Sequence, residues 1–163
     1  MALQEITALM SKLATLHESL LELSKQKTEF LKDGDTDGIQ KTLVNEKKHI
    51  QAIQQLEEKR ATLTEQWFKQ VAPAVSDYTI TAMIDHVENA ADKEKLNGIY
   101  ERLIMAIASL KQQEQLNADL TKQSLQFVEL TMELLEPTIK NMNYGDQHTG
   151  KSSHSRSIFD SKA

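Results

Sequence analysis

The residues that interrupt helices are rare in this sequence. The chain has only five glycines and two prolines among its 163 residues, about a third of the share in an average globular protein. A β-sandwich or barrel needs turns at short intervals, so these all-β classes are excluded. A doubly wound α/β enzyme is disfavoured because its phosphate and catalytic loops depend on glycine. The sequence therefore predicts long helices.

Apolar residues recur at steps of three and four over four segments, which is the spacing of one helix face. The long segments are 2–32, 36–70 and 92–136, and the short one is 80–89. Short connections make successive helices antiparallel neighbours. We therefore predict an all-α fold: an elongated antiparallel bundle of three long helices plus one short helix, with a flexible C-terminal tail. The helical bundle domain is expected over 1–140 and the tail over 141–163, which has few large apolar residues.

Turn-forming and capping residues set the expected helix boundaries. The stretch 33–38 contains two glycines and three aspartates, so it should end the first helix and reverse the chain. Thr79 and Asp92 are expected to cap the short helix and the last helix. Pro137 is expected to end the last helix because proline has no backbone donor and clashes with the preceding turn.

The net charge and the cysteine content limit the kinds of partner and the compartment that we expect for this protein. The chain carries a net charge of -5 and no cysteine, and no basic face suited to nucleic acid stands out. Segment 1–13 carries Glu5 and no basic region, so it is not a secretory signal. The longest apolar run, 103–110, is far shorter than a bilayer span. We expect a cytoplasmic protein with no nucleic-acid partner and no membrane insertion.

Two motif matches lack the context that their chemistry needs. Residues 145–152 satisfy the phosphate-binding pattern G-x-x-x-x-G-K-[ST], but no buried strand precedes them, so no nucleotide is expected. Residues 33–38 match the opening of an EF-hand loop, yet the twelfth position holds Val44 where a bidentate glutamate belongs. An acidic turn that caps the second helix explains this stretch better.

A single E-x-x-H pair, Glu46 and His49, lies in the second predicted helix. A di-iron carboxylate bundle needs a second pair and two further inward glutamates, and the sequence has no second copy. His17 and His86 are expected to pack on helix flanks. No nucleophile and base can be singled out, so we expect no enzyme, no metal and no cofactor.

The last predicted helix carries two apolar stripes where a surface helix usually has one. The first stripe comprises Leu116, Leu120, Phe127, Leu130 and Leu134. The second stripe lies about 140° away and comprises Leu125, Val128, Met132, Leu135 and, if the helix persists, Ile139. The first stripe is expected to build the bundle. The second either packs against another helix of the bundle or forms a groove for a partner's amphipathic helix, which methionine would suit.

Four segments in the last third of the chain are distinctive. They are 116–120 (LNADL), 124–127 (SLQF), Tyr144-Gly145 with Gly150 following, and 157–163 (SIFDSKA). Together with the earlier helices and the Gly/Asp break between them, these segments resemble the FlgN family of flagellar export chaperones. The family form Tyr-Gly-x-x-Gly is longer here by two residues before Gly150.

The resemblance implies a non-enzymatic cytoplasmic chaperone for the hook-associated proteins that join the flagellar hook to the filament. It implies that the second stripe and the tail, including Ile158 and Phe159, engage terminal amphipathic helices of the cargo and prevent premature association. It also implies that Tyr144 docks at the export gate.

A different class stays open beside the chaperone: a self-associating coiled-coil adaptor or structural protein that uses the same stripes without export cargo. A homodimer is compatible with either class. A stable oligomer indifferent to export cargo would favour the adaptor, whereas co-purification with terminal helices of hook-associated proteins would favour the chaperone. A metal-binding bundle enzyme is disfavoured by the single E-x-x-H pair.

Overall fold

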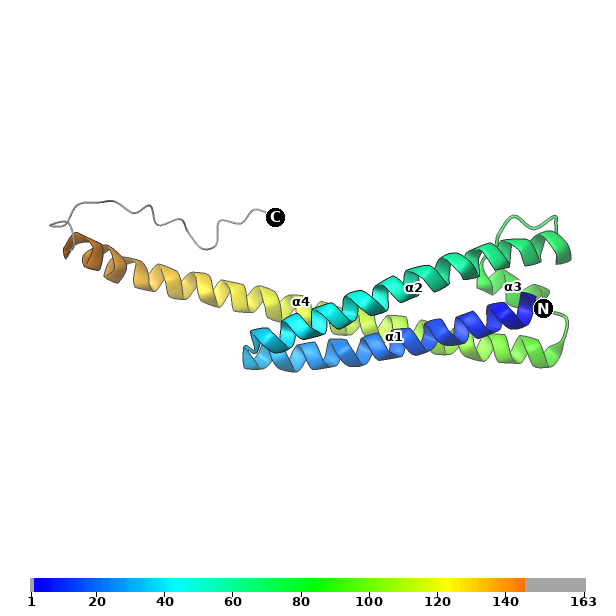
Figure 1. The fold of residues 1–163 in the computed structure, drawn as a ribbon, viewed down its shortest axis with the longest axis horizontal. Coiled ribbons are helices and arrows are strands. Elements are labelled where there is room, and N and C mark those ends of the chain that lie inside the picture. The colour runs from blue at the N-terminus through cyan, green and yellow to red at the C-terminus, as the bar shows by residue number, and fades with distance from the viewer. Residues whose placement is uncertain (1, 146–163) are drawn as a thin grey trace. The chain divides into compact units, whose positions relative to one another are not determined.

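The structure is a computed structural model that describes residues 2–145, with side chains from Ala2 to Pro137 and that of Met142. It has four helices: α1 (Ala2–Asp33), α2 (Thr36–Val71), α3 (Ile80–His86) and α4 (Ala90–Gly145). The predicted all-α fold of three long helices and one short helix is confirmed (Figure 1). The chain divides into two units, Met1–Lys122 and Gln123–Ala163. The predicted tail lies outside the described residues beyond Gly145.

Helices α1 and α2 form an antiparallel hairpin, with the tight reversal where it was predicted (Figure 1). Gly34 adopts a φ of 68°, a left-handed conformation that glycine enters without a steric penalty. The Asp35 carboxylate then accepts a hydrogen bond of 2.9 Å from the amide of Gly38 and caps α2. The interpretation of 33–38 as an acidic turn and cap is therefore confirmed.

Gly38 is a second glycine that this turn requires. A Cβ atom at position 38 would lie 2.5–2.7 Å from ring atoms of Phe30. We expect Gly38→Ala to lower the free energy of unfolding by about 1–3 kcal/mol, because the ring must shift in a packed turn. Gly98→Ala is the matched control, since a Cβ there meets nothing within 4 Å. It should raise the free energy of unfolding by about 0.8–1 kcal/mol through helix propensity. Urea unfolding of both variants measures the difference, and equal effects would contradict it.

Helix α3 begins where predicted, because the Thr79 hydroxyl accepts a hydrogen bond of 3.2 Å from the amide of Ala82. It ends at His86 and not at the expected residue 89, since Val87 already has an extended backbone. The loop before α3 and the helix itself pack on the buried ring of Phe68. The ring centroids of Tyr78 and His86 lie 5.4 and 5.9 Å from that of Phe68.

The expected bounds of the last helix were wrong at both ends. Helix α4 starts at Ala90, because the side chain of Asn89 accepts the capping bond from the amide of Asp92 at 3.0 Å. At the other end the helix continues through Pro137 to Gly145. Pro137 is exposed, so water can reach the carbonyl that has lost its helical donor, and the interruption costs one hydrogen bond without ending the helix.

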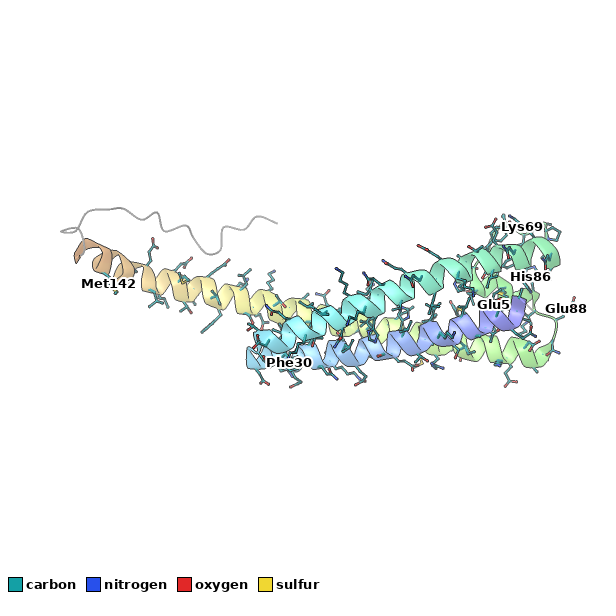
Figure 2. The ribbon with its side chains drawn as sticks, in the orientation of Figure 1. Glu5, Phe30, Lys69, His86, Glu88 and Met142 are labelled. Atoms are coloured by element: carbon teal, nitrogen blue, oxygen red, sulfur yellow. The ribbon has the colours of Figure 1, made fainter. Side chains whose placement is uncertain are left out.

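The interior of the Met1–Lys122 unit is apolar in one half. Its most buried hydrophobic side chains come from all four helices: Ile6, Met10, Leu13, Phe68, Met83 and Leu96. This half contains the N-terminus of α1, the C-terminus of α2 and α3. Glu5, Lys69 and His86 mark the same end in Figure 2. Burial of these side chains supplies the hydrophobic stabilisation of the bundle.

The other half, next to the hairpin turn marked by Phe30 in Figure 2, has a polar interior. Every buried side chain between Leu20 and Trp67 is polar. The buried polar side chains of this half are Ser24, Lys27, Thr28, Thr42, Glu46 and Asn117. Polar side chains are stable inside a bundle only when they satisfy one another by hydrogen bonds or ion pairs.

Candidate partner-binding surface

The second stripe is exposed on α4. Leu125, Val128, Met132 and Leu135 are 51%, 39%, 43% and 46% exposed. Ile139 lies within the helix, but its side chain is not among those described. A row of half-exposed apolar side chains along one helix face is the kind of surface that binds a partner, so the second stripe is a candidate interaction surface.

The first stripe is exposed as well, which corrects the expectation that it builds the bundle. Phe127, Leu130 and Leu134 are 70%, 53% and 71% exposed, and Leu116 is 43% exposed. Leu120 is partly buried. The prediction failed because periodicity identifies an apolar face but not whether another element covers it.

Acidic side chains lie beside the second stripe between Leu125 and Leu135, and Lys122 lies one turn before Leu125. Glu129, Glu133 and Glu136 are the only charged residues between Gln123 and Pro137. A surface of leucine, valine and methionine flanked by carboxylates favours a partner helix that is apolar on one side and basic at its edges.

The other candidate residues fall near or beyond the end of the described chain. Tyr144 lies in the last turn of α4, whereas a position after the helix was expected. Ile158 and Phe159, like the motif at 145–152 after its first residue, lie outside the described residues.

A cluster that periodicity did not predict joins α1, α2 and α4 within the Met1–Lys122 unit. We call it the polar layer; its members are Ser24, Lys27, Thr28, Glu46, Gln113, Glu114 and Asn117. The ammonium of Lys27 donates to Glu46 Oε2 at 3.1 Å and to Glu114 Oε1 at 3.0 Å. Its Nζ also lies 2.9 Å from Glu46 Oε1. One cation from α1 thus binds a carboxylate from each of two other helices.

The remaining polar-layer groups satisfy one another. Ser24 donates to Glu114 at 2.8 Å, and the Asn117 amide donates to the backbone carbonyl of Ser24 at 2.9 Å. Thr28 donates to Asn117 and accepts from Gln113. These bonds connect α1 to α4 over nearly a hundred residues of sequence, so they fix how α4 lies along the hairpin in this unit.

The ammonium of Lys27 stays charged in this setting. Burial favours the neutral amine, but hydrogen bonds to Glu46 and Glu114 and the charges of both carboxylates outweigh it and raise the pKa of Lys27. A raised pKa means that the folded state binds the proton more tightly than the unfolded chain does.

The free energy of unfolding is therefore expected to fall at high pH. The contribution of Lys27 is complete below the ordinary lysine pKa of 10.5 and is lost as the pH rises through the higher folded value. Urea unfolding measures the free energy of unfolding of the wild type and of Lys27→Met between about pH 9 and 12. Other groups titrate in both proteins, so the difference between the two pH curves belongs to Lys27. Parallel curves for the two proteins would contradict the assignment.

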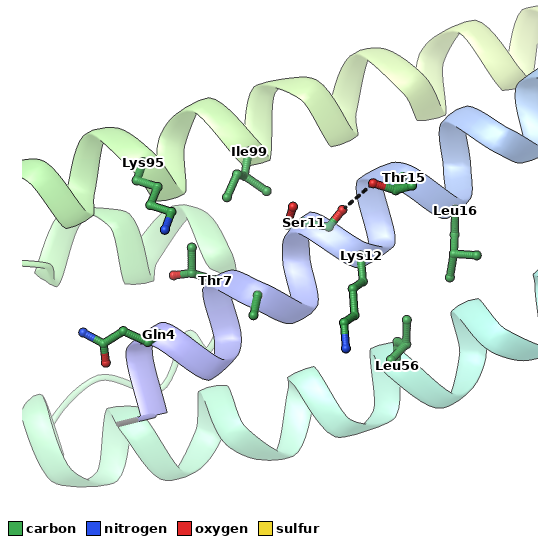
Figure 3. A pocket seen from close by; sticks show the side chains of 10 residues that line it. Gln4, Thr7, Ser11, Lys12, Thr15, Leu16, Leu56, Lys95 and Ile99 are labelled. Carbon is green, nitrogen blue, oxygen red and sulfur yellow. Dashed lines mark hydrogen bonds between the residues drawn. The ribbon is translucent and has the colours of Figure 1, made fainter.

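A cavity of about 640 Å³ opens along α1 near its N-terminus. Figure 3 shows this cavity from close by: two of the residues that line it, Lys95 on α4 and Leu56 on α2, lie on opposite sides of α1. Its polar lining residues are lysines, hydroxyls and one amide, with no carboxylate or imidazole among them. This set offers no acid and base pair, so the cavity is not an active-site candidate.

The E-x-x-H pair has structural partners. Glu46 pairs with Lys27, while His49 Nε2 lies 2.8 Å from the Ser19 hydroxyl and His49 Nδ1 lies 2.8 Å from the carbonyl of Asn45. Both side chains hold α2 to α1. Within residues 2–137, no three histidine, aspartate or glutamate side chains gather in a way that could hold a metal ion.

A model of the family described as FlgN protein matches residues 1–151. The chain belongs to the FlgN family. The family resemblance is thereby confirmed, and with it a general role as a flagellar export chaperone. FlgN proteins form a family of chaperones and not of enzymes.

A curated relative matches this FlgN protein over its full length. "Uncharacterized protein YvyG" of Bacillus subtilis (strain 168) is 34% identical over 165 residues, which covers 100% of both chains. No solved structure matches. None of the FlgN helices, over the residues that the structure describes, has the length and hydropathy needed to cross a bilayer.

The sequence of this FlgN protein gave two weak signals of the polar layer. Lys27 interrupts the apolar face that runs along the first helix from Ile6 to Phe30, and Glu46 belongs to the isolated E-x-x-H pair. Neither signal identified the partner, because Glu114 lies 87 residues after Lys27.

Proposed function

We propose that this protein is a cytoplasmic export chaperone that binds terminal amphipathic helices of hook-associated proteins through the second stripe. The exposure of Leu125, Val128, Met132 and Leu135 on one helix is the observation that carries the proposal. Apolar side chains at this spacing match the i, i+3, i+4 and i+7 anchors of an amphipathic partner helix.

Covering the cargo helices explains how the chaperone acts. Hook-associated proteins assemble through terminal helices, so a chaperone helix seated on them prevents association before export. The acidic residues beside the stripe favour cargo helices with basic edges. Ile158 and Phe159 in the tail add apolar contacts, and Tyr144 presents the loaded chaperone to the export gate.

The binding should be moderate and reversible. A tail that orders on binding loses part of the gross interaction energy to conformational entropy, which lowers affinity for a given contact area. Release at the export gate requires such a complex, since a very tight one would retain the cargo.

Calorimetric titration of the full chain with peptides that span the terminal helices of hook-associated proteins tests the proposal. We expect one peptide helix to bind each chain, and a peptide with its apolar residues replaced by serine to fail to bind. Absence of binding to every terminal helix would contradict the cargo assignment. Double substitution of Ile158 and Phe159 by serine should weaken binding without abolishing it.

A further inference from the structure

Apolar side chains remain exposed where α2 and α4 flank α1. Leu43, Ile50, Ile104 and Ile107 are 49%, 45%, 45% and 40% exposed. Together with Ile53, which is partly buried, we call these residues the α2–α4 surface. All five lie within the Met1–Lys122 unit, and none belongs to either stripe of α4.

The members of this surface share one face on each helix. On α2, Ile50 lies seven residues after Leu43 and three before Ile53. On α4, Ile104 lies three residues before Ile107. Spacings of three and seven residues bring side chains to the same side of a helix. Ile53 and Ile107 line one cavity of about 240 Å³, so the two faces are turned toward each other.

Hydrogen bonds to α1 place the two helices at matching heights. His49 Nε2 on α2 lies 2.8 Å from the Ser19 hydroxyl oxygen, and Arg102 on α4 donates to Glu18. Ser19 and Glu18 are consecutive residues of α1. The isoleucines at positions 50 and 104, one and two residues further on, therefore lie at nearly the same level along the bundle.

Helix α3 packs next to this surface. Ile80, the first residue of α3, lines the same cavity as Ile53 and Ile107. The Thr81 hydroxyl donates to the hydroxyl of Tyr100 on α4 at 3.3 Å. The chain thus uses a short helix of its own to cover the neighbouring part of α2 and α4. Among the described residues, no element continues α3 over the α2–α4 surface.

Two exposed lysines border the surface at the end away from α3. Lys47 lies three residues before Ile50 on α2, and Lys111 lies four residues after Ile107 on α4. At these spacings each lysine is a neighbour of the apolar residue on its helix. Among the described side chains, neither lysine has an ion-pair or hydrogen-bond partner. Two unneutralised positive charges favour a partner with carboxylates at the matching positions.

Carboxylates of the chain close to the surface have other partners. Glu57 accepts a hydrogen bond of 2.8 Å from Arg60, and Glu101 accepts one of 3.1 Å from the amide of Asn97. Glu114 belongs to the polar layer, where it binds a buried ammonium. None of these three carboxylates pairs with the bordering lysines, so the positive charge there is available to a partner.

We propose that the α2–α4 surface binds an amphipathic helix of another protein, apolar on one side and with carboxylates at its edges. A partner helix of about three turns spans the surface, because ten residues separate Leu43 from Ile53 and each adds about 1.5 Å. The helix continues along α2 and α4 from the place that α3 covers, and its carboxylates meet Lys47 and Lys111.

This partner differs from the one assigned to the second stripe. The second stripe is flanked by glutamates and favours a helix with basic edges, whereas the α2–α4 surface favours a helix with acidic edges. The inference goes beyond the proposed function and does not rest on it. The tail of the chain is a poor occupant, because residues 146–163 contain three lysines and arginines against two aspartates.

Fluorescence anisotropy of the full chain with a designed helical peptide tests the charge requirement. The probe is a labelled peptide of about four turns with leucines on one side and glutamates at both edges. We expect it to bind, and we expect Lys47→Glu/Lys111→Glu to weaken binding by roughly tenfold or more. Lys41→Glu/Lys48→Glu is the matched control. Each of its positions lies two residues before a member of the surface, about 200° around α2, and binding should change by less than about threefold.

A second pair of variants tests the apolar contact. Ile50→Ser/Ile104→Ser should also weaken binding of the acidic peptide by roughly tenfold or more, because two apolar contacts at the centre of the interface are lost. Leu125→Glu/Met132→Glu should leave it nearly unchanged, since the second stripe is a different surface. Circular dichroism verifies that the variants keep their helicity, and the exposed lysine variants provide an independent test.

Four outcomes would overturn the proposal. The acidic peptide could fail to bind, or its binding could be indifferent to Lys47→Glu/Lys111→Glu. Loss of binding only in Leu125→Glu/Met132→Glu would place the peptide on the second stripe. Sedimentation velocity gives the fourth: an oligomer of the wild type that Lys47→Glu/Lys111→Glu disperses would assign the surface to a second copy of the chain. Absence of cargo binding with the acidic peptide still bound would contradict the proposed function alone.

Discussion

Replacing Lys27 by methionine is expected to lower the free energy of unfolding by about 3–5 kcal/mol, the usual cost of removing one partner from a buried ion pair. The side chains of Lys27 and Glu46 are only 10% and 9% exposed. Without the ammonium, Glu46 remains buried as an uncompensated charge. Glu114 contributes less to this cost because its side chain is 43% exposed and solvent screens it.

Two further variants identify the cause of that loss. Lys27→Met/Glu46→Leu should recover most of the stability, because a buried pair replaced by apolar groups of similar size is often neutral. Lys25→Met is the matched control. Lys25 is 52% exposed and, among the described residues, its ion pair is with the exposed Glu22, so its loss should change the free energy of unfolding by less than about 0.5 kcal/mol. Urea unfolding measures all three, and equal effects at positions 25 and 27 would refute the role of burial.

The double substitution Leu125→Glu/Met132→Glu is expected to weaken cargo binding by about a hundredfold or more. Both side chains are half exposed, so helix α4 does not need them for its own packing. The loss should therefore appear in titrations with cargo helices while the helical circular dichroism signal stays unchanged.

Two controls separate loss of the apolar surface from other effects. Leu125→Met/Met132→Leu keeps the surface apolar and should change the affinity by no more than about threefold. Gln126→Glu adds a charge to the same helix outside the second stripe and should leave cargo binding nearly unchanged. Collapse of the helicity in the glutamate variant would show that the stripe supports the fold instead of cargo.

The fold could be predicted from the sequence because the signals that determine its helices and turns act over only a few residues. The apolar spacing of three and four residues, the aspartates of the 33–38 turn and Thr79 each act within a few residues, and each placed a helix or a cap as observed. Predictions at the ends of α4 failed where two local signals competed. Asn89 took the capping role expected of Asp92, and Pro137 was tolerated because its position is exposed.

The functional surfaces were harder to predict because they depend on distant parts of the chain. Periodicity located both stripes, but it could not show that Phe127 and Leu134 are 70% and 71% exposed. The polar layer needs a lysine, two glutamates and an asparagine from three helices, and its pairs are separated by up to 93 residues. The spacing of residues within one helix cannot predict such contacts between helices.

The division of the bundle into an apolar half and a polar half implies that the two ends open with different ease. Apolar packing around Phe68 resists transient opening, whereas polar contacts next to the hairpin turn can be exchanged for water at small net cost. Backbone amides of α1 near Thr28 and of α2 near Thr42 should therefore exchange with deuterium sooner than those near Met10 and Phe68. The less stable half of the bundle would then lie beside the hairpin turn, and brief local opening there would not unfold the whole bundle.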